Sequence, residues 1–299
     1  MKGKILICDP VDNIMIEKLS EKFDIDNDPE ITRDELLKRI KDYDVIIVRS
    51  RTKIDKDIID NAKKLKIIAR AGIGTDTIDV DYANEKGIKI VYAPGSSTES
   101  VVELTLAFAV IAARQIIRGV ENTRKNDFTK LKGIELSGKR LGIIGYGRIG
   151  RAIANAFKAF NVSSMAYDAY PVDFTGAEQV SLDKLLMDSD IISINITLRK
   201  DSPPVLNEKE LSLIKNDAIV INTSRANAID PKAFLKILRE KNIVYISDVF
   251  WHEPARFDYE FEMLKLPNVI ITPHLGAQTK EAQKRIAIMT ADNILKEWA

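Results

Sequence analysis

Short apolar runs alternate with charged segments along the first ninety residues. The runs are rich in β-branched residues and lack polar alternation, as is typical of strands buried on both faces of a sheet. Segments 12–19 and 32–40 carry apolar residues at helical spacing, and Thr32 with Glu35 has the signature of a capping box. This alternation predicts a parallel sheet with right-handed crossovers. The strands are expected at 4–8, 23–25, 45–48, 66–69 and 89–92.

A second alternating series follows Pro94-Gly95 and a nearly all-apolar segment. That segment, 100–119, predicts a helix with both faces covered, which we expect to lie between domains, between subunits, or both. Six strands separated by helical segments describe a doubly wound nucleotide-binding domain. The last segment, 279–298, is helical in pattern, and we expect it to fold back onto the first domain. The six strands are expected at 140–144, 164–167, 191–196, 218–222, 244–247 and 269–272.

Composition excludes several classes of protein. The 299 residues suffice for two domains, and 45% hydrophobic with 30% charged residues is ordinary for a globular protein. A formal net charge of +1 argues against a dedicated nucleic-acid binder. The longest apolar stretch, 101–113, contains Glu103 and is shorter than the ~20 residues of a membrane span. Cys8, the single cysteine, fits a reducing compartment, so we expect a soluble cytoplasmic protein without nucleic-acid or membrane partners.

The expected strand 140–144 runs directly into a glycine-rich loop, Gly145-Tyr-Gly-Arg-Ile-Gly150. Gly145 permits a tight turn, Gly147 lets the backbone approach a pyrophosphate, and Gly150 allows the next helix to pack closely on the strand. The helix N-terminus adds N–H groups and a positive dipole. Asp168, at the end of the next strand, has the spacing of a ribose-binding carboxylate, and no arginine follows it directly. This pattern predicts NAD rather than NADP as the cofactor.

Three polar motifs stand at the carboxyl ends of later strands, which doubly wound sheets bring to the crevice of the glycine loop. They contain a cation (Arg225), an acid (Glu253) and His274. Hydride transfer involving a hydroxy acid needs a cation for the carboxylate, a base for the hydroxyl proton, and an acid that holds the base. The other histidine, His252, adjoins Glu253 and is expected to point elsewhere. The motifs occupy residues 222–225, 248–254 and 272–277.

The combination of these motifs, with their order and spacing along the chain, resembles that of the D-isomer-specific 2-hydroxyacid dehydrogenase family. The resemblance covers essentially the whole chain and implies an α/β fold of two doubly wound parallel-sheet domains with a cleft between them. A flavodoxin-like substrate domain would be discontinuous, formed by 1–95 plus 280–299. A Rossmann NAD-binding domain would span 96–279.

The resemblance also implies roles for individual residues. Arg225 would bind the substrate carboxylate and polarise the C2 oxygen. His274 would take the hydroxyl proton as hydride leaves C2, and Glu253 would hydrogen-bond its imidazole. Asp248 is expected near the nicotinamide end of the cofactor, and no metal is implied. The other implied cofactor contacts come from Arg148, Ile149, Thr197, Thr223, Ser224, Gly276 and Ala277.

Two segments depart from the family pattern. Ala226 follows Arg225 where the family usually has glycine, so we expect the local backbone to differ slightly. Residues 195–201 replace a segment that commonly carries histidine and proline. This departure affects the adenosine-side contacts and leaves Thr197 as the contact expected there.

Within the family, the first domain is most similar to that of the D-3-phosphoglycerate dehydrogenases. This similarity implies NAD-dependent oxidation of D-3-phosphoglycerate to 3-phosphohydroxypyruvate, the first step of phosphorylated serine biosynthesis. With the chain ending at Ala299, no serine-sensing C-terminal domain is expected. Basic and hydroxyl side chains after one strand would bind the phosphate, and backbone N–H groups after the next would hold the carboxylate. These groups are Arg49, Ser50 and Lys53, and Ala71, Gly72, Ile73 and Gly74.

Alternatives to this activity stay open. Glyoxylate or hydroxypyruvate reduction, or D-lactate oxidation, would use the same catalytic residues without a phosphate site. A non-catalytic NAD(H)-sensing regulatory protein would keep the glycine loop and lose the chemistry, whereas Arg225, Glu253 and His274 are all present here. The family resemblance further implies a homodimer, formed through the apolar helix from about residue 100 and the residues that follow it.

Overall fold

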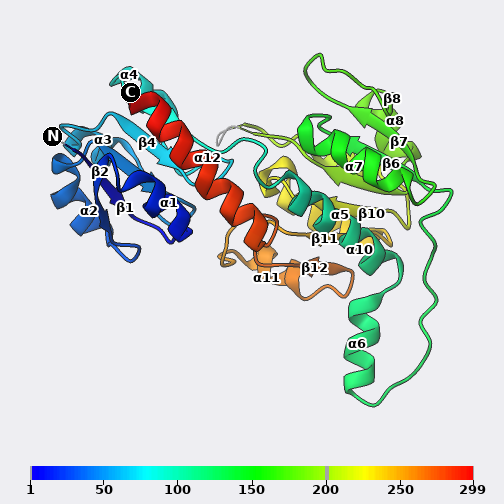
Figure 1. Cartoon of the computed structure of the whole chain (residues 1–299). Helices are drawn as coiled ribbons and strands as arrows, with labels where there is room; N and C mark the ends of the chain where they lie inside the picture. Colours follow the sequence, from blue (N-terminus) through cyan, green and yellow to red (C-terminus); the bar gives the residue numbers. More distant parts are fainter. Residues whose placement is uncertain (1, 199–201, 299) are drawn as a thin grey trace. The chain divides into compact units, whose positions relative to one another are not determined.

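The computed structural model describes residues 2–198 and 202–298, which form two compact units (Figure 1). One unit comprises the N-terminal segment up to Ser97 together with the C-terminal segment from Gln278, and the other spans Thr98–Ala277. Each unit is built on one parallel sheet. The α/β class with two parallel sheets, predicted from the alternating pattern, is therefore confirmed.

The first unit has the strand order β2-β1-β3-β4-β5, the doubly wound order of flavodoxin-like domains. The predicted capping box is present, because Glu35 accepts from the backbone N–H of Thr32 and Glu35 N–H donates to the Thr32 hydroxyl. Helix α12 (Lys280–Trp298) packs against α1. The strands are β1 (Gly3–Ile7), β2 (Phe23–Asn27), β3 (Val45–Val48), β4 (Ile67–Arg70) and β5 (Lys89–Val91). The other helices are α1 (Asn13–Leu19), α2 (Arg33–Arg39), α3 (Lys56–Asn61) and α4 (Val80–Glu85), with a 3₁₀ turn at Ile40–Asp42.

The second unit has the strand order β12-β11-β10-β9-β6-β7-β8. Successive strands are added on one side of β6 up to β8 and on its other side from β9 onward, so the loop after β6 lies at the topological switch point where such sheets bind ligands. Its strands are β6 (Arg140–Ile144), β7 (Ser163–Tyr167), β8 (Glu178–Gln179), β9 (Ile191–Ile194), β10 (Ile219–Asn222), β11 (Val244–Ser247) and β12 (Val269–Ile271). Its helices are α5 (Thr98–Ala113), α6 (Ile116–Arg124), α7 (Arg148–Lys158), α8 (Leu182–Asp188), α9 (Glu208–Leu213), α10 (Pro231–Glu240) and α11 (Asp258–Leu264), with a 3₁₀ turn at Ala226–Ala228.

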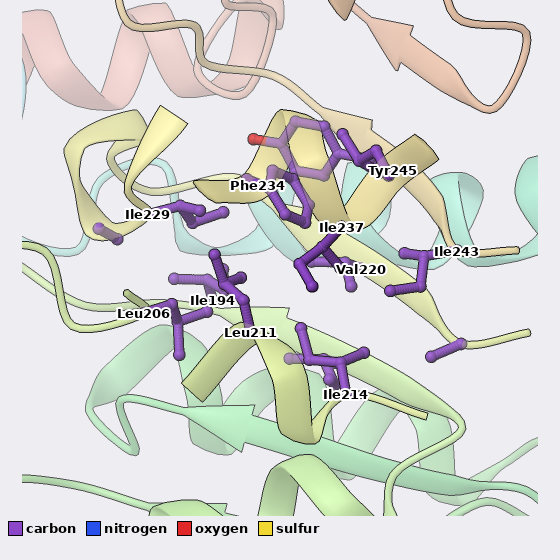
Figure 2. Packing of buried hydrophobic residues seen from close by; sticks show 14 of the residues in the cluster. Ile194, Leu206, Leu211, Ile214, Val220, Ile229, Phe234, Ile237, Ile243 and Tyr245 are labelled. Carbon is purple, nitrogen blue, oxygen red and sulfur yellow. The ribbon is translucent and has the colours of Figure 1, made fainter. Parts of the chain in front are cut away.

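Both faces of this second sheet are buried, which explains its uninterrupted apolar strands. On β10, Val220 contributes to the cluster drawn in Figure 2, whereas Ile219 and Ile221 point to the opposite cluster. In the first cluster, Phe234 of α10 meets Tyr245 of β11 edge-on, with ring centroids 4.8 Å apart. The two clusters pack against the sheet from either side.

Two elements differ from the prediction. Strand β8 was not predicted, because its two residues are exposed and form no apolar run. The single helix expected over 100–119 is instead two helices, α5 and α6, bent by 61°. The break occurs at Gln115, whose φ of 51° is left-handed, and α6 buries none of its residues. Because α6 buries no residue, no packing interaction holds it in line with α5, and it leads away from the axis of α5 in Figure 1.

No single helix within residues 2–198 and 202–298 is long and apolar enough to cross a membrane. Only the bent pair of α5 and α6 reaches the necessary length and composition. Eight residues of α5, among them Phe108 and Ala109, are buried.

Candidate active site

The glycine loop has the geometry that its sequence predicted. Gly145 has a φ of +92°, and a Cβ there would lie 2.7 Å from the Asn195 carbonyl oxygen. A Cβ on Gly150 would lie 2.3 Å from the Gly145 carbonyl oxygen, so only glycine lets α7 approach β6 this closely. A Cβ on Gly147 would meet nothing within 4 Å. The space beside Gly147, at the start of α7, is therefore open to a pyrophosphate, with Arg148 and Ile149 in the first helical turn.

Asp168 is oriented by the same loop. One of its carboxylate oxygens accepts from the backbone N–H of Tyr146 at 2.7 Å, and the other accepts from that of Tyr170 at 3.0 Å. The carboxylate keeps lone pairs for ribose hydroxyls and would repel a 2′-phosphate. Sequence reasoning missed Tyr146, which is fully buried, donates to the Thr175 carbonyl oxygen at 3.0 Å and stacks on Phe174. The sequence offered one signal for this role of Tyr146: a large aromatic residue stands between Gly145 and Gly147, where the glycine motif itself allows any side chain.

His274 and Glu253 form a hydrogen-bonded pair. The loop after β12 carries His274, whose Nδ1 lies 3.2 Å from one carboxylate oxygen of Glu253. The other oxygen of Glu253 accepts from the Phe250 N–H at 2.9 Å, which turns the carboxylate toward the imidazole. Because Nδ1 faces Glu253, Nε2 is the nitrogen left to exchange a proton with a substrate. The His274 side chain is 56% exposed, which leaves that nitrogen accessible.

Charge reinforces the pairing. The hydrogen bond that His274 donates to Glu253 raises the pKa of His274, and the charges of Glu253 and Asp248 raise it further, whereas burial and the charge of Arg225 oppose the rise. Burial raises the pKa of Glu253, but bonds from His274 and the Phe250 N–H, with the charge of Arg225, lower it overall. The charge of Arg225 lowers the pKa of both partners, so Arg225 lies within electrostatic range of Glu253 and His274 in the second unit.

The turn that presents Arg225 is held by Asn222, a fully buried residue at the end of β10. Its amide donates to the Arg225 carbonyl oxygen at 3.0 Å, and its oxygen accepts from the Ser224 N–H at 3.0 Å. The Thr223 hydroxyl lies 3.3 Å from the hydroxyl of Thr105 on α5. Ala226 is buried, so its methyl group is accommodated where the family usually has glycine. Asn222 begins the predicted motif 222–225, but the sequence indicates no role for it, because its two bonds form only in the folded turn.

Asp248 orients the loop that carries His274. It is 2% exposed and accepts from the Thr272 hydroxyl at 2.5 Å and from the N–H groups of Leu275 and Gly276 at 2.7 and 2.6 Å. Gly276 permits this approach, since a Cβ there would lie 3.1 Å from the carboxylate. The contacts of Asp248 thus flank His274 on both sides, and a direct contact with nicotinamide stays a prediction.

The remaining predicted positions take no part in the hydrogen bond that joins Glu253 to His274. Thr197 is exposed just after β9, and Ala277 ends the second unit. Of the divergent segment 195–201, residues 199–201 lie outside the described residues. His252 points to Glu260, with its Nδ1 2.7 Å from the carboxylate. In the chain from 2 to 198 and from 202 to 298, no group of three or more His, Cys, Asp or Glu side chains could hold a metal ion.

The predicted substrate residues belong to the first unit, and several of them already make hydrogen bonds within it. Arg49 donates its backbone N–H to the buried Asp9 and a guanidinium N–H to the Pro10 carbonyl oxygen at 3.1 Å. Burial lowers the pKa of Arg49, while Ser50 and Lys53 are exposed.

The expected carboxylate cradle is narrower than the sequence suggested. The N–H of Ala71 donates to the Val48 carbonyl oxygen and that of Gly72 to the Arg70 carbonyl oxygen. The N–H groups of Ile73 and Gly74 make no such bond within the described residues. The cradle is therefore reduced to these last two N–H groups, because the ladder to β3 uses that of Ala71 and a tight turn after β4 uses that of Gly72.

Comparison with known proteins agrees with this geometry. Residues 106–276 match the family of D-isomer specific 2-hydroxyacid dehydrogenases, NAD binding domain. A hydroxypyruvate reductase from Thermotoga maritima is 40% identical over 299 residues, covering 98% of each chain. A D-3-phosphoglycerate dehydrogenase from Methanocaldococcus jannaschii is also 40% identical, over 98% of this chain and 57% of that protein.

Solved structures extend the similarity to the whole fold. The crystal structure of D-lactate dehydrogenase from Aquifex aeolicus, complexed with NAD and lactic acid, superposes with a TM-score of 0.87 at 26% identity. The match covers 99% of this chain and 95% of that one. This chain therefore belongs to the D-isomer-specific 2-hydroxyacid dehydrogenase family and is an NAD-dependent oxidoreductase that acts on a CH–OH group.

Proposed function

We propose that this enzyme reduces a small unphosphorylated 2-oxo acid, hydroxypyruvate or glyoxylate, with NADH. The observation that carries the proposal is the extent of the match: the hydroxypyruvate reductase is similar along nearly its entire length. The phosphoglycerate dehydrogenase is equally identical, but this chain spans little more than half of it. Oxidation of D-3-phosphoglycerate, the first expectation from the sequence, is therefore less well supported than its alternative.

The basic loop of the first unit also argues against phosphate recognition. Besides Arg49, Arg51 is committed to the chain, since its guanidinium donates to Asp9 and to the carbonyl oxygens of Ile31 and Pro29. Of the predicted phosphate ligands, Arg49 is partly buried and gives one guanidinium N–H to the Pro10 carbonyl oxygen, and Lys53 is an exposed point charge. A phosphate dianion is normally held by several charge-assisted bonds, often bidentate ones from arginine.

The residues of the second unit account for the chemistry. Bound NADH would lie along the glycine loop with its ribose on Asp168, and it supplies the hydride that C2 of the 2-oxo acid accepts. Arg225 would hold the substrate carboxylate and draw electron density toward the C2 oxygen. His274 would donate a proton from Nε2 to that oxygen as C2 is reduced, which leaves a hydroxyl group and neutral imidazole. Glu253 stabilises the imidazolium before the transfer and fixes the ring orientation.

A substrate panel tests this proposal. With the purified protein and NADH, we expect kcat/KM for hydroxypyruvate or glyoxylate to exceed that for phosphohydroxypyruvate by about tenfold or more, ~1.4 kcal/mol of discrimination. Absorbance of NADH gives the rates. Preference for the phosphorylated acid, lost in Arg49→Ala and Lys53→Ala, would instead establish the phosphoglycerate activity and the role of the basic loop.

We also propose that the first unit binds the substrate and that the enzyme is a homodimer. Helix α6 buries no residue, and it and the segment after it expose large apolar side chains that a second copy would cover. These exposed side chains are Ile116, Ile117, Val120, Phe128 and Ile134.

Sedimentation at micromolar concentration checks the dimer. The double variant Val120→Glu, Phe128→Glu places two charges on the apolar surface and is expected to sediment as a monomer, while the unaltered protein sediments as a dimer. Met187→Glu, an equally polar change at a 49% exposed position of α8, should leave the dimer intact. A monomeric unaltered protein would contradict the prediction.

A further inference from the structure

A second histidine–carboxylate pair adjoins the catalytic one in the chain. His252 immediately precedes Glu253, and its Nδ1 lies 2.7 Å from the carboxylate of Glu260 on α11. The two acids differ sharply in exposure, since the Glu253 side chain is 41% exposed and that of Glu260 is fully buried. Burying a carboxylate costs free energy unless several donors compensate it.

Glu260 has those donors, and all of them come from the loop around Glu253. Its second carboxylate oxygen accepts from the N–H of Arg256 at 2.7 Å and from the N–H of Phe257 at 3.1 Å. Burial raises the pKa of Glu260, but the bonds from Arg256, His252 and Phe257 lower it overall, so the group is ionised at neutral pH. The His252 ring also meets Phe257 edge-on, with centroids 5.0 Å apart.

The loop needs such fixing because it has no regular structure of its own. Between β11 and α11 the chain forms neither helix nor strand. Its beginning is anchored by Asp248, which accepts from the loop of His274, and by the Trp251 indole, which donates to the Ile229 carbonyl oxygen at 3.0 Å. Beyond that point, the Glu260 carboxylate bonds to His252, just before Glu253, and to the N–H groups of Arg256 and Phe257, which follow it. This one carboxylate therefore holds the chain on both sides of Glu253.

We propose that Glu260 and His252 are positioning residues for the reaction, which hold the loop so that the Glu253 carboxylate stays bonded to His274. Neither touches the reacting atoms. The proposal rests on the proposed roles of Glu253 and His274 but not on which 2-oxo acid is reduced. Displacement of Glu253 by a fraction of an ångström would weaken a contact that is already 3.2 Å long.

The pKa of His274 is the decisive readout. The chain contains only two histidines, so NMR of the imidazole carbons resolves His274 from His252 and measures each titration without substrate. The charged groups that act on His274 are Glu253, Asp248 and Arg225. Because Glu253 raises the pKa of His274, we expect Glu253→Gln to lower it, and Glu260→Ala to lower it in the same direction by a smaller amount.

Activity should follow the titration. Reduction needs protonated His274, so kcat/KM falls as pH rises through its pKa, and the fall should begin at lower pH in Glu260→Ala. We expect kcat to drop by about tenfold, because small misplacements of catalytic groups carry costs of this order. KM for NADH should not change. Glu260→Gln keeps an acceptor for the Arg256 and Phe257 N–H groups and should give an intermediate effect.

A neighbouring acid provides the control. Glu262 is on the same helix but is half-exposed and pairs with Arg239 at 2.9 Å, so Glu262→Ala should leave the titration and kcat unchanged. A folded Glu260→Ala or Glu260→Gln protein with a normal His274 titration would overturn the proposal, even if its Tm is lower. Absence of turnover in the unaltered protein would instead refute the proposed function, while the NMR titration would still decide the role of Glu260.

Discussion

Replacement of His274 by asparagine is expected to lower kcat for 2-oxo acid reduction by roughly 10³-fold, within the range of general acid catalysis. Asparagine cannot donate the proton at neutral pH. It also tolerates the left-handed backbone that His274 adopts, with a φ of 56°, so the loop should keep its shape. The half-exposed side chain leaves no cavity when it is shortened. Stopped-flow or steady-state NADH absorbance measures the rate.

Cofactor binding serves as the internal control for this variant. The glycine loop and Asp168 are distinct from His274, so the Kd of NADH, measured by fluorescence, should be unchanged in His274→Asn. Turnover equal to that of the unaltered protein would refute the acid role of His274. If the unaltered protein bound NADH and reduced no 2-oxo acid, the NAD(H)-sensing alternative would replace the enzymatic one.

Two alanine substitutions in the glycine loop are expected to affect different properties, Gly150→Ala the stability of the fold and Gly147→Ala the binding of NADH. Gly150→Ala places a methyl group 2.3 Å from the Gly145 carbonyl oxygen, so α7 must move away from β6, at a cost of about 1–3 kcal/mol in unfolding free energy. Gly147→Ala meets nothing within 4 Å and has an ordinary φ of −76°, so the free energy of unfolding should not change. Its methyl group would instead occupy the space proposed for the pyrophosphate.

The two measurements therefore separate folding from binding. Gly147→Ala should weaken NADH binding by about tenfold or more, which corresponds to ~1.4 kcal/mol, with an unchanged denaturation midpoint. Gly150→Ala should lower the denaturation midpoint. Normal NADH affinity in Gly147→Ala would show that the cofactor phosphates lie elsewhere than along the start of α7.

Local pattern was enough to predict the two sheets. The apolar runs of β3 and β10 have no polar alternation because both of their faces are buried, so their sequences alone indicate parallel strands between helix layers. Thr32 with Glu35, and the spacing from Gly145 to Asp168, are likewise local signals of a helix start and a nucleotide-binding turn. The break at Gln115 had no such local signal, because it depends on the absence of a surface that would bury residues of α6.

At the active site, sequence by itself determined which residue types were available, and the order of the motifs identified Arg225, Glu253 and His274. Only the tertiary structure decided the hydrogen-bond partners of the other two carboxylates, Asp248 and Glu260. Asp248 binds the loop of His274 across 27 and 28 positions of the chain, and the buried Glu260, rather than Glu253, takes His252. Such hydrogen bonds need donor and acceptor to be placed to within a few tenths of an ångström by separate segments of the chain, and residue order alone does not encode that placement.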